Sequence, residues 1–129
     1  MMPRKAAPLA LACEDLARGL ALSVAAWPEP ARTLVGSGLV QAVIALSVAT
    51  QVALASPARR ERALGDADVA LITLRVHLRV ARAIGAITDG AHLARTEELT
   101  RVGRMLGGWI RSIRDSSPRT GGGPPATGA

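Results

Sequence analysis

Few side chains in this sequence are of the types that catalyse reactions or hold metal ions. His77 and His92 are the only imidazoles, and Cys13 is the only thiol. A nucleophilic or general-base site needs such groups within reach of one another, and no known motif surrounds either histidine. A zinc site needs three or four Cys and His ligands at defined spacings, which the sequence lacks. We therefore expect no catalytic residue, no metal site and no cofactor.

A short glycine motif makes only a weak case for phosphate binding. The segment Gly36-Ser37-Gly38 lacks the Gly-Lys-Ser/Thr continuation with which a phosphate loop cradles its ligand. A bend or a close contact between helices is the alternative interpretation of these glycines. We prefer the alternative and expect no phosphate loop.

Arginine is the most abundant charged residue, and guanidinium groups are well suited to bind phosphate. The 129 residues carry a net charge of +6, and residues 75–114 contain eight arginines against three acids. Arginines spaced by three or four residues share one helix face, where they can contact successive phosphates. The candidate nucleic-acid or partner contacts are Arg75, Arg79, Arg82, Arg101, Arg104 and Arg111.

Two considerations bound this hypothesis. Phe and Tyr are absent and only Trp27 and Trp109 are aromatic, so platforms for stacking bases are nearly excluded and any nucleic-acid binding must be mostly electrostatic. The alternative is a solvated face whose arginines pair with Asp68, Glu97 or Glu98. For any single arginine the two interpretations are equally supported, and only the cluster favours binding.

The elements that must position these side chains are helices. We expect the first helix to open near Pro8 and to stop before the Trp27-Pro28-Glu29-Pro30 cluster, and a second over residues 31–55. Ser56 and Pro57 form an N-cap signature for a third helix, which Gly85 ends. Thr88 or Asp89 then caps a fourth helix that reaches about residue 115. Apolar residues of the third helix alternate at spacings of three and four, as in a packed bundle; these are Leu64, Ala67, Leu71, Leu74, Leu78 and Ala81.

The fourth helix has the clearest amphipathic pattern. Its apolar residues fit an arc of about 100°, with the arginines across the helix; the arc contains Leu99, Val102, Leu106, Trp109, Ile110 and Ile113. Gly103, Gly107 and Gly108 each cost about 1 kcal/mol relative to Ala inside a helix. We expect another helix to approach closely there, with Leu106, Gly107 and Trp109 shaping the packing.

No strand pattern is present, so the fold class is all-α, an antiparallel up-and-down four-helix bundle. The length allows one domain. We expect a flexible N-terminus over residues 1–8, the bundle over residues 9–115 and a disordered Pro/Gly-rich tail over residues 116–129. A single cysteine suits a reducing compartment, and the expected location is the cytoplasm.

A membrane helix is the main structural alternative. No charged residue occurs between Thr33 and Ala58, a stretch long enough to span a bilayer. Against a span, Thr33, Ser37, Gln41, Ser47 and Gln51 gather on one side of the helix, and glutamine is unfavourable at bilayer depth without partners. We favour a central bundle helix and keep a small membrane protein anchored by residues 33–55 as the alternative.

Several segments together resemble a known family. Residues 75–82 (RVHLRVAR), the turn at residues 85–88 and above all residues 102–110 (VGRMLGGWI) are similar to the accessory variability determinant family of diversity-generating retroelements. Trp27-Pro28, followed by Arg32, Leu34 and Gly36, resembles the start of that family's second helix. The resemblance covers roughly residues 15–114.

The resemblance implies a fold, partners and an activity. Members are all-helical bundles that assemble as basic homopentameric barrels, bind the element's reverse transcriptase, and support RNA-templated, adenine-mutagenic cDNA synthesis without being enzymes. The expected partners are therefore the reverse transcriptase, template RNA and cDNA, and further copies of the chain, with no membrane. A general four-helix-bundle interaction protein is a further alternative, because related bundles have other partners.

Overall fold

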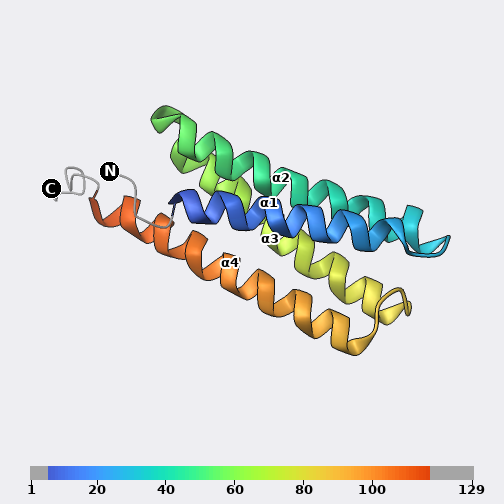
Figure 1. The fold of residues 1–129 in the computed structure, drawn as a ribbon. Coiled ribbons are helices and arrows are strands. Elements are labelled where there is room, and N and C mark those ends of the chain that lie inside the picture. The colour runs from blue at the N-terminus through green and yellow to red at the C-terminus, as the bar shows by residue number, and fades with distance from the viewer. Residues whose placement is uncertain (1–5, 117–129) are drawn as a thin grey trace, which may run out of the picture.

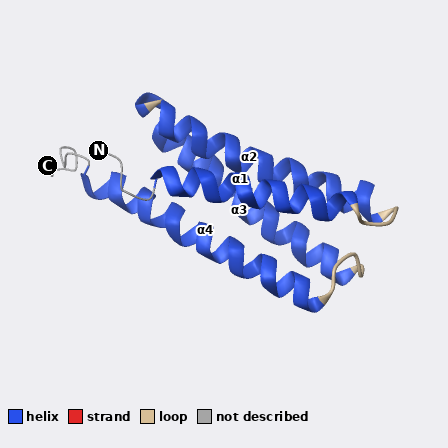
Figure 2. Ribbon diagram, in the orientation of Figure 1, coloured by secondary structure: helices blue, strands red, loops and turns tan. Residues whose placement is uncertain are grey.

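The computed structural model describes residues 6–116, which form four long helices (Figure 1). These are α1 (Ala6–Ala25), α2 (Ser37–Ala55), α3 (Arg60–Ala83) and α4 (Asp89–Ser116). A π-helical turn, Arg32–Gly36, leads into α2, and a 3₁₀ turn, Pro57–Arg59, leads into α3. No strand occurs within residues 6–116 (Figure 2). The predicted all-α class with four helices is confirmed.

Consecutive helices run in opposite directions, with α1 and α3 antiparallel to α2 and α4 (Figure 1). Each helix contacts its two neighbours around the bundle, while the diagonal pairs α1/α3 and α2/α4 do not approach one another. Contact is densest between α2 and α3 and sparsest between α1 and α4. The core lies between the four helices and is built mainly of leucine and alanine.

The ends of the chain differ in part from the expectation. Helix α1 begins at Ala6, two residues before the opening predicted near Pro8, so residues 6–8 of the N-terminal segment predicted over residues 1–8 belong to the helix. Pro8 lies within the first helical turn, where its missing N–H removes no hydrogen bond. Residues 1–5 and the predicted tail from residue 117 onward lie outside the described residues; Ser116 is the last residue of α4.

The α2–α3 connection departs from the predicted N-cap. Ser56 has extended backbone angles, but its side chain makes no capping hydrogen bond. Arg60 instead closes this corner, because its Nε donates to the carbonyl of Ala53 at 2.7 Å and its Nη2 to the carbonyl of Leu54 at 3.4 Å. The last carbonyls of α2, which have no partner within the helix, are satisfied by a side chain that follows the turn.

The α3–α4 connection follows the predicted chemistry. Gly85 has a φ of +80°, and the amides of Gly85 and Ala86 donate back to the carbonyls of Arg82 and Ala81. This is a Schellman motif, whose left-handed position favours glycine. Thr88, rather than Asp89, caps α4, since its Oγ1 accepts from the amide of Ala91 at 3.1 Å.

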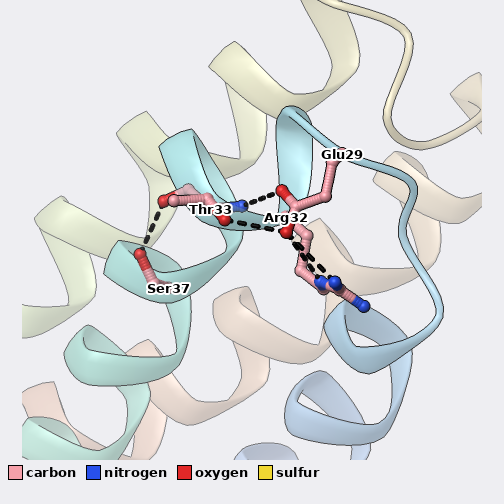
Figure 3. Close-up of polar contacts among 4 residues, drawn as sticks. All are labelled: Glu29, Arg32, Thr33 and Ser37. Atoms are coloured by element: carbon pink, nitrogen blue, oxygen red, sulfur yellow. Dashed lines mark hydrogen bonds and ion pairs between the residues drawn. The ribbon is translucent and has the colours of Figure 1, made fainter.

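Glu29 organises the α1–α2 connection (Figure 3). Its Oε1 accepts from the Thr33 amide at 3.0 Å, and its Oε2 accepts from the Thr33 hydroxyl at 2.8 Å and from the Arg32 guanidinium. The hydrogen bonds from Thr33, together with Arg32, lower the pKa of Glu29. A carboxylate thus satisfies a free N–H at the start of the helix, where negative charge is also favoured by the helix dipole.

Candidate functional site

The three candidate arginines of α4 lie on the face turned away from the core. Arg101, Arg104 and Arg111 are exposed, while Leu99, Val102, Leu106 and Trp109 of the same helix are buried. The predicted division of α4 into an apolar face and a basic face is confirmed. A helix packed on one side only presents its other side to partners.

Two of the candidate arginines lie beside glycines of α4: Arg75 reaches across from α3, and Arg111 lies along α4 itself. The Arg75 guanidinium lies 3.6 Å from the position that a Cβ would occupy on Gly103, and the Arg111 guanidinium lies 3.4 Å from the same position on Gly107. Gly103 and Gly107 are one helical turn apart, about 6 Å. Because these two glycines have no side chains, they leave space that the guanidinium groups of Arg75 and Arg111 occupy.

Of the three glycines at which a close helix was expected, only Gly103 has side chains of another helix nearby, Arg75 and Leu71 of α3; Gly107 and Gly108 do not. A Cβ on Gly107 would meet only the mobile end of Arg111, and a Cβ on Gly108 only the same group at 4.0 Å. No second helix of the described chain packs against them, so the close approach expected at Gly107 is not made inside the bundle. A contact with another molecule at this point stays a prediction.

Close helix packing occurs instead at the glycine motif of the second helix. A Cβ on Gly36 would lie 2.5 Å from Cγ1 of Val24, and a Cβ on Gly38 would lie 2.5 Å from Nε2 of His77. Gly36 thus lets α1 approach, and Gly38 lets the imidazole on α3 approach. The packing interpretation of Gly36-Ser37-Gly38 is confirmed.

Ion pairing separates the six candidate arginines. Arg82 pairs with Asp89 at 3.0 Å, and Arg75 is half-buried against α4. The other four have exposed side chains without a carboxylate within 4.0 Å in residues 6–116; they are Arg79, Arg101, Arg104 and Arg111. Of the acids expected to neutralise them, Glu98 pairs with Arg95 instead, and Asp68 and Glu97 pair with no described residue.

Arg101 also borders a cleft that the sequence did not predict. The first ten residues of α4 have no buried side chain, and a cleft of about 480 Å³ opens where this half of α4 meets α1 and α3. Trp27, Leu78 and Ile87 contribute apolar walls, and Arg95 and Arg101 contribute charge. The cleft joins an apolar surface to the basic face of α4.

Trp109 is a core residue. Only 1% of it is exposed, and its ring lies 5.9 Å from the Arg60 guanidinium, a cation–π distance. Its Nε1 is buried without a hydrogen-bond partner in the described chain. A ring this buried leaves no face on which a base could stack, and Leu106 is buried in the same core.

The remaining reactive groups are held in structural positions. Nδ1 of His77 donates to the Thr73 carbonyl at 2.8 Å, since a carbonyl oxygen can only accept. Burial raises the pKa of the Cys13 thiol to about 11, which leaves little reactive thiolate at neutral pH. Within residues 6–116, no three His, Cys, Asp or Glu side chains gather as a metal site would need.

Sequence reasoning missed the outward face of α3. The core seam of this helix is confirmed, but a second apolar row lies opposite it, in solvent. This row, called here the α3 stripe, consists of Val69, Ile72, Val76 and Val80, exposed by 62%, 57%, 42% and 42%. The signal was present in the sequence, because these residues are also spaced by three or four and so share one side of a helix.

Comparison with known proteins gives no relative. No protein-family model, curated protein or solved structure matches the chain. Function is therefore inferred from the residues and the geometry of the bundle.

Proposed function

We propose that this protein is a non-catalytic accessory factor of a diversity-generating retroelement. It is a basic, self-associating scaffold that holds the reverse transcriptase and its template RNA or cDNA together during mutagenic reverse transcription. The observation that carries the proposal is the segment from Val102 to Ile110, whose sequence resembles that family. The same segment supplies both the Trp109 core contact and the outward Arg104.

Exposed arginines of α3 and α4 support the polyanion-binding part of the proposal. Arg79, Arg101, Arg104 and Arg111 are exposed and have no acidic partner in the described chain. Cations that are not neutralised within the protein remain available to displace counterions from phosphates. Arg75 and Arg82 contribute less, because one is half-buried and the other is paired with Asp89.

The salt dependence of RNA binding tests this part. The slope of log affinity against log salt for a single strand is about −0.7 per neutralised phosphate. We expect Arg104→Glu/Arg111→Glu to weaken binding of a single-stranded RNA and to reduce the slope by about 1 to 1.5. Arg18→Glu/Arg62→Glu makes the same change in net charge elsewhere and should have a smaller effect. Equal effects of the two double variants would show that only net charge matters.

The genetic setting tests the biological part. A reverse transcriptase gene and a pair of template and variable repeats should lie beside the gene for this protein. The two proteins should copurify when expressed together. Absence of both the polymerase gene and the repeats would contradict the assignment, whatever the RNA affinity.

The membrane alternative rests on one specific feature. The helical stretch Arg32–Ala55 is long and apolar enough to cross a membrane by length and composition, with 39% of its most apolar window buried in the bundle. Core helices of soluble proteins pass the same test, and Leu39, Val43 and Leu46 are fully buried here. We favour the bundle helix, and recovery of untagged protein only in detergent would support the anchor.

A further inference from the structure

The α3 stripe is an apolar surface that no described residue covers. Its four side chains follow the solvent side of one helix for three turns, and Gly65 extends the row toward the start of the helix. Isolated exposed apolar residues are common, but a continuous row on an otherwise charged helix marks a contact surface. The outward side of α2 also carries apolar side chains, with Ile44 and Val48 more than half exposed.

Charged residues flank this stripe on the side toward α4 in a regular order. They recur every seven residues, which is two helical turns and about 10.5 Å. The column changes sign at its middle, with two acids in the first half of α3 and two arginines in the second. Its members, called here the charged column, are Glu61, Asp68, Arg75 and Arg82.

The residues of the charged column border the seam between α3 and α4 and are available for contact with another molecule. Glu61 and Asp68 border the open cleft between α3 and α4, and Arg75 lies beside Gly103 in the same seam. None of these three has an ion pair within residues 6–116. Arg82 pairs with Asp89, but both side chains are more than half exposed, so exchanging that partner costs little.

We propose that a second copy of this chain docks antiparallel along α3, stripe against stripe, with Asp68 opposite Arg75 and Glu61 opposite Arg82 of the other copy. Both pairs have their midpoint between residues 71 and 72, so one two-fold axis satisfies both at once. A parallel arrangement would place acids beside acids and arginines beside arginines. Flanking charges select the orientation of paired helices in this way.

The same two-fold axis also decides which other surfaces of the two copies would face each other. It sets α2 beside α2 of the other copy, where Ile44 and Val48 are exposed and uncharged. It leaves Arg104 and Arg111 of α4 outside the helix pair. The contact is isologous and is complete with two copies. It therefore differs from the head-to-tail contact that forms a ring. This contact does not depend on RNA binding.

Charge reversal with mixing tests the pairing. Asp68→Arg places arginine against arginine in a pair of identical copies, and Arg75→Asp places aspartate against aspartate. Each variant alone should dimerise at least about tenfold more weakly than the unmodified chain in sedimentation equilibrium. An equimolar mixture should recover association as a mixed dimer, because both facing pairs are then attractive. The double variant carrying both changes should recover it alone.

A matched control lies on the same helix. Asp66→Arg makes the same charge change on the opposite flank of the α3 stripe. It should dimerise alone as the unmodified chain does, and it should form a mixed dimer with Arg75→Asp no more tightly than the unmodified chain does. Glu61→Arg and Arg82→Asp repeat the test at two exposed residues if Arg75→Asp loses helicity by circular dichroism.

Four outcomes would overturn the proposal. They are a monomeric unmodified chain, unchanged association of the single variants, a mixture that fails to recover, and a five-copy species insensitive to all these changes. A chain that is monomeric in buffer but binds phosphatidylcholine vesicles would assign the stripe to a lipid surface instead. None of these results depends on RNA binding, so the contact and the proposed function fail separately.

Discussion

Individual side chains in this bundle often act at a distance from their own element. Arg60 belongs to α3, yet it donates to the final carbonyls of α2 and lies over the Trp109 ring of α4. One guanidinium therefore links three helices at the end of the bundle where α2 connects to α3. Arg59, its neighbour in sequence, is exposed and its side chain makes no such contact.

Replacing Arg60 by Ala should lower the free energy of unfolding by about 1 to 3 kcal/mol. The loss combines charge-assisted hydrogen bonds with the cation–π contact. Urea unfolding followed by circular dichroism measures the change. Arg59→Ala is the control and should stay within about 0.5 kcal/mol of the unmodified chain; a comparable loss in both would mean that Arg60 stabilises through net charge alone.

At the scale of the element, each connection uses different residues to end one helix and begin the next. The α3–α4 turn uses Gly85 and Thr88, and both follow from rules of local sequence. The α1–α2 turn uses Glu29, which reaches forward four residues to Thr33. Helix packing adds a second constraint, because α2 presents glycine where α1 and the His77 ring approach.

Glycine substitutions at two positions should have opposite signs. Gly36→Ala should destabilise the protein by about 1 to 3 kcal/mol, since the new Cβ would overlap the buried Val24. Gly65→Ala should stabilise it by about 0.5 to 1 kcal/mol, because nothing lies within 4 Å and alanine favours the helix. Thermal melting of the two variants checks the prediction, and a stabilising Gly36→Ala would contradict the packing seen at α1.

The Glu29 cap should make stability depend on pH in a defined direction. Its pKa in the folded chain lies below the ordinary 4.5, so its contribution is present above pH 4.5 and is lost as the pH falls through the folded-state pKa. Glu29→Ala should therefore have a lower free energy of unfolding than the unmodified chain at pH 7, and this difference, the gap, should narrow below pH 4.5. Urea titrations at several pH values measure the gap. Glu97→Ala, at an exposed unpaired acid of α4, should show a smaller gap at pH 7.

On the scale of the whole molecule, stability is unevenly distributed along α4. Its buried side chains begin at Leu99, and residues 89–98 stand beside the cleft with none buried. Helix α2, by contrast, packs between α1 and α3 with seven buried residues. The half of α4 with few core contacts is thus the part of the bundle best suited to adjust to a partner.

Hydrogen exchange should show this difference directly. Backbone amides of residues 93–98 should exchange faster than those of residues 102–110, because local opening of the first segment exposes little apolar surface. Mass spectrometry of peptides from α4 measures both rates in one experiment. Uniform protection along α4 in a monomeric sample would contradict the prediction, whereas protection gained only on adding a partner would place the partner at the cleft.

The sequence by itself determined the four helices, the division of α4 into core and basic faces, and the stop of α3 at Gly85. These features depend on period and on residues a few positions apart, which are properties of a single helix. Tertiary structure alone decided at which glycines another helix packs closely. Gly36 and Gly107 look alike in sequence, but only Gly36 meets another helix. It also decided that Arg82 is paired while Arg104 has no ion pair within residues 6–116, and that no described residue covers the α3 stripe. Such outcomes depend on how far each helix is rotated against the next, and that rotation is set by the packing of all four helices together.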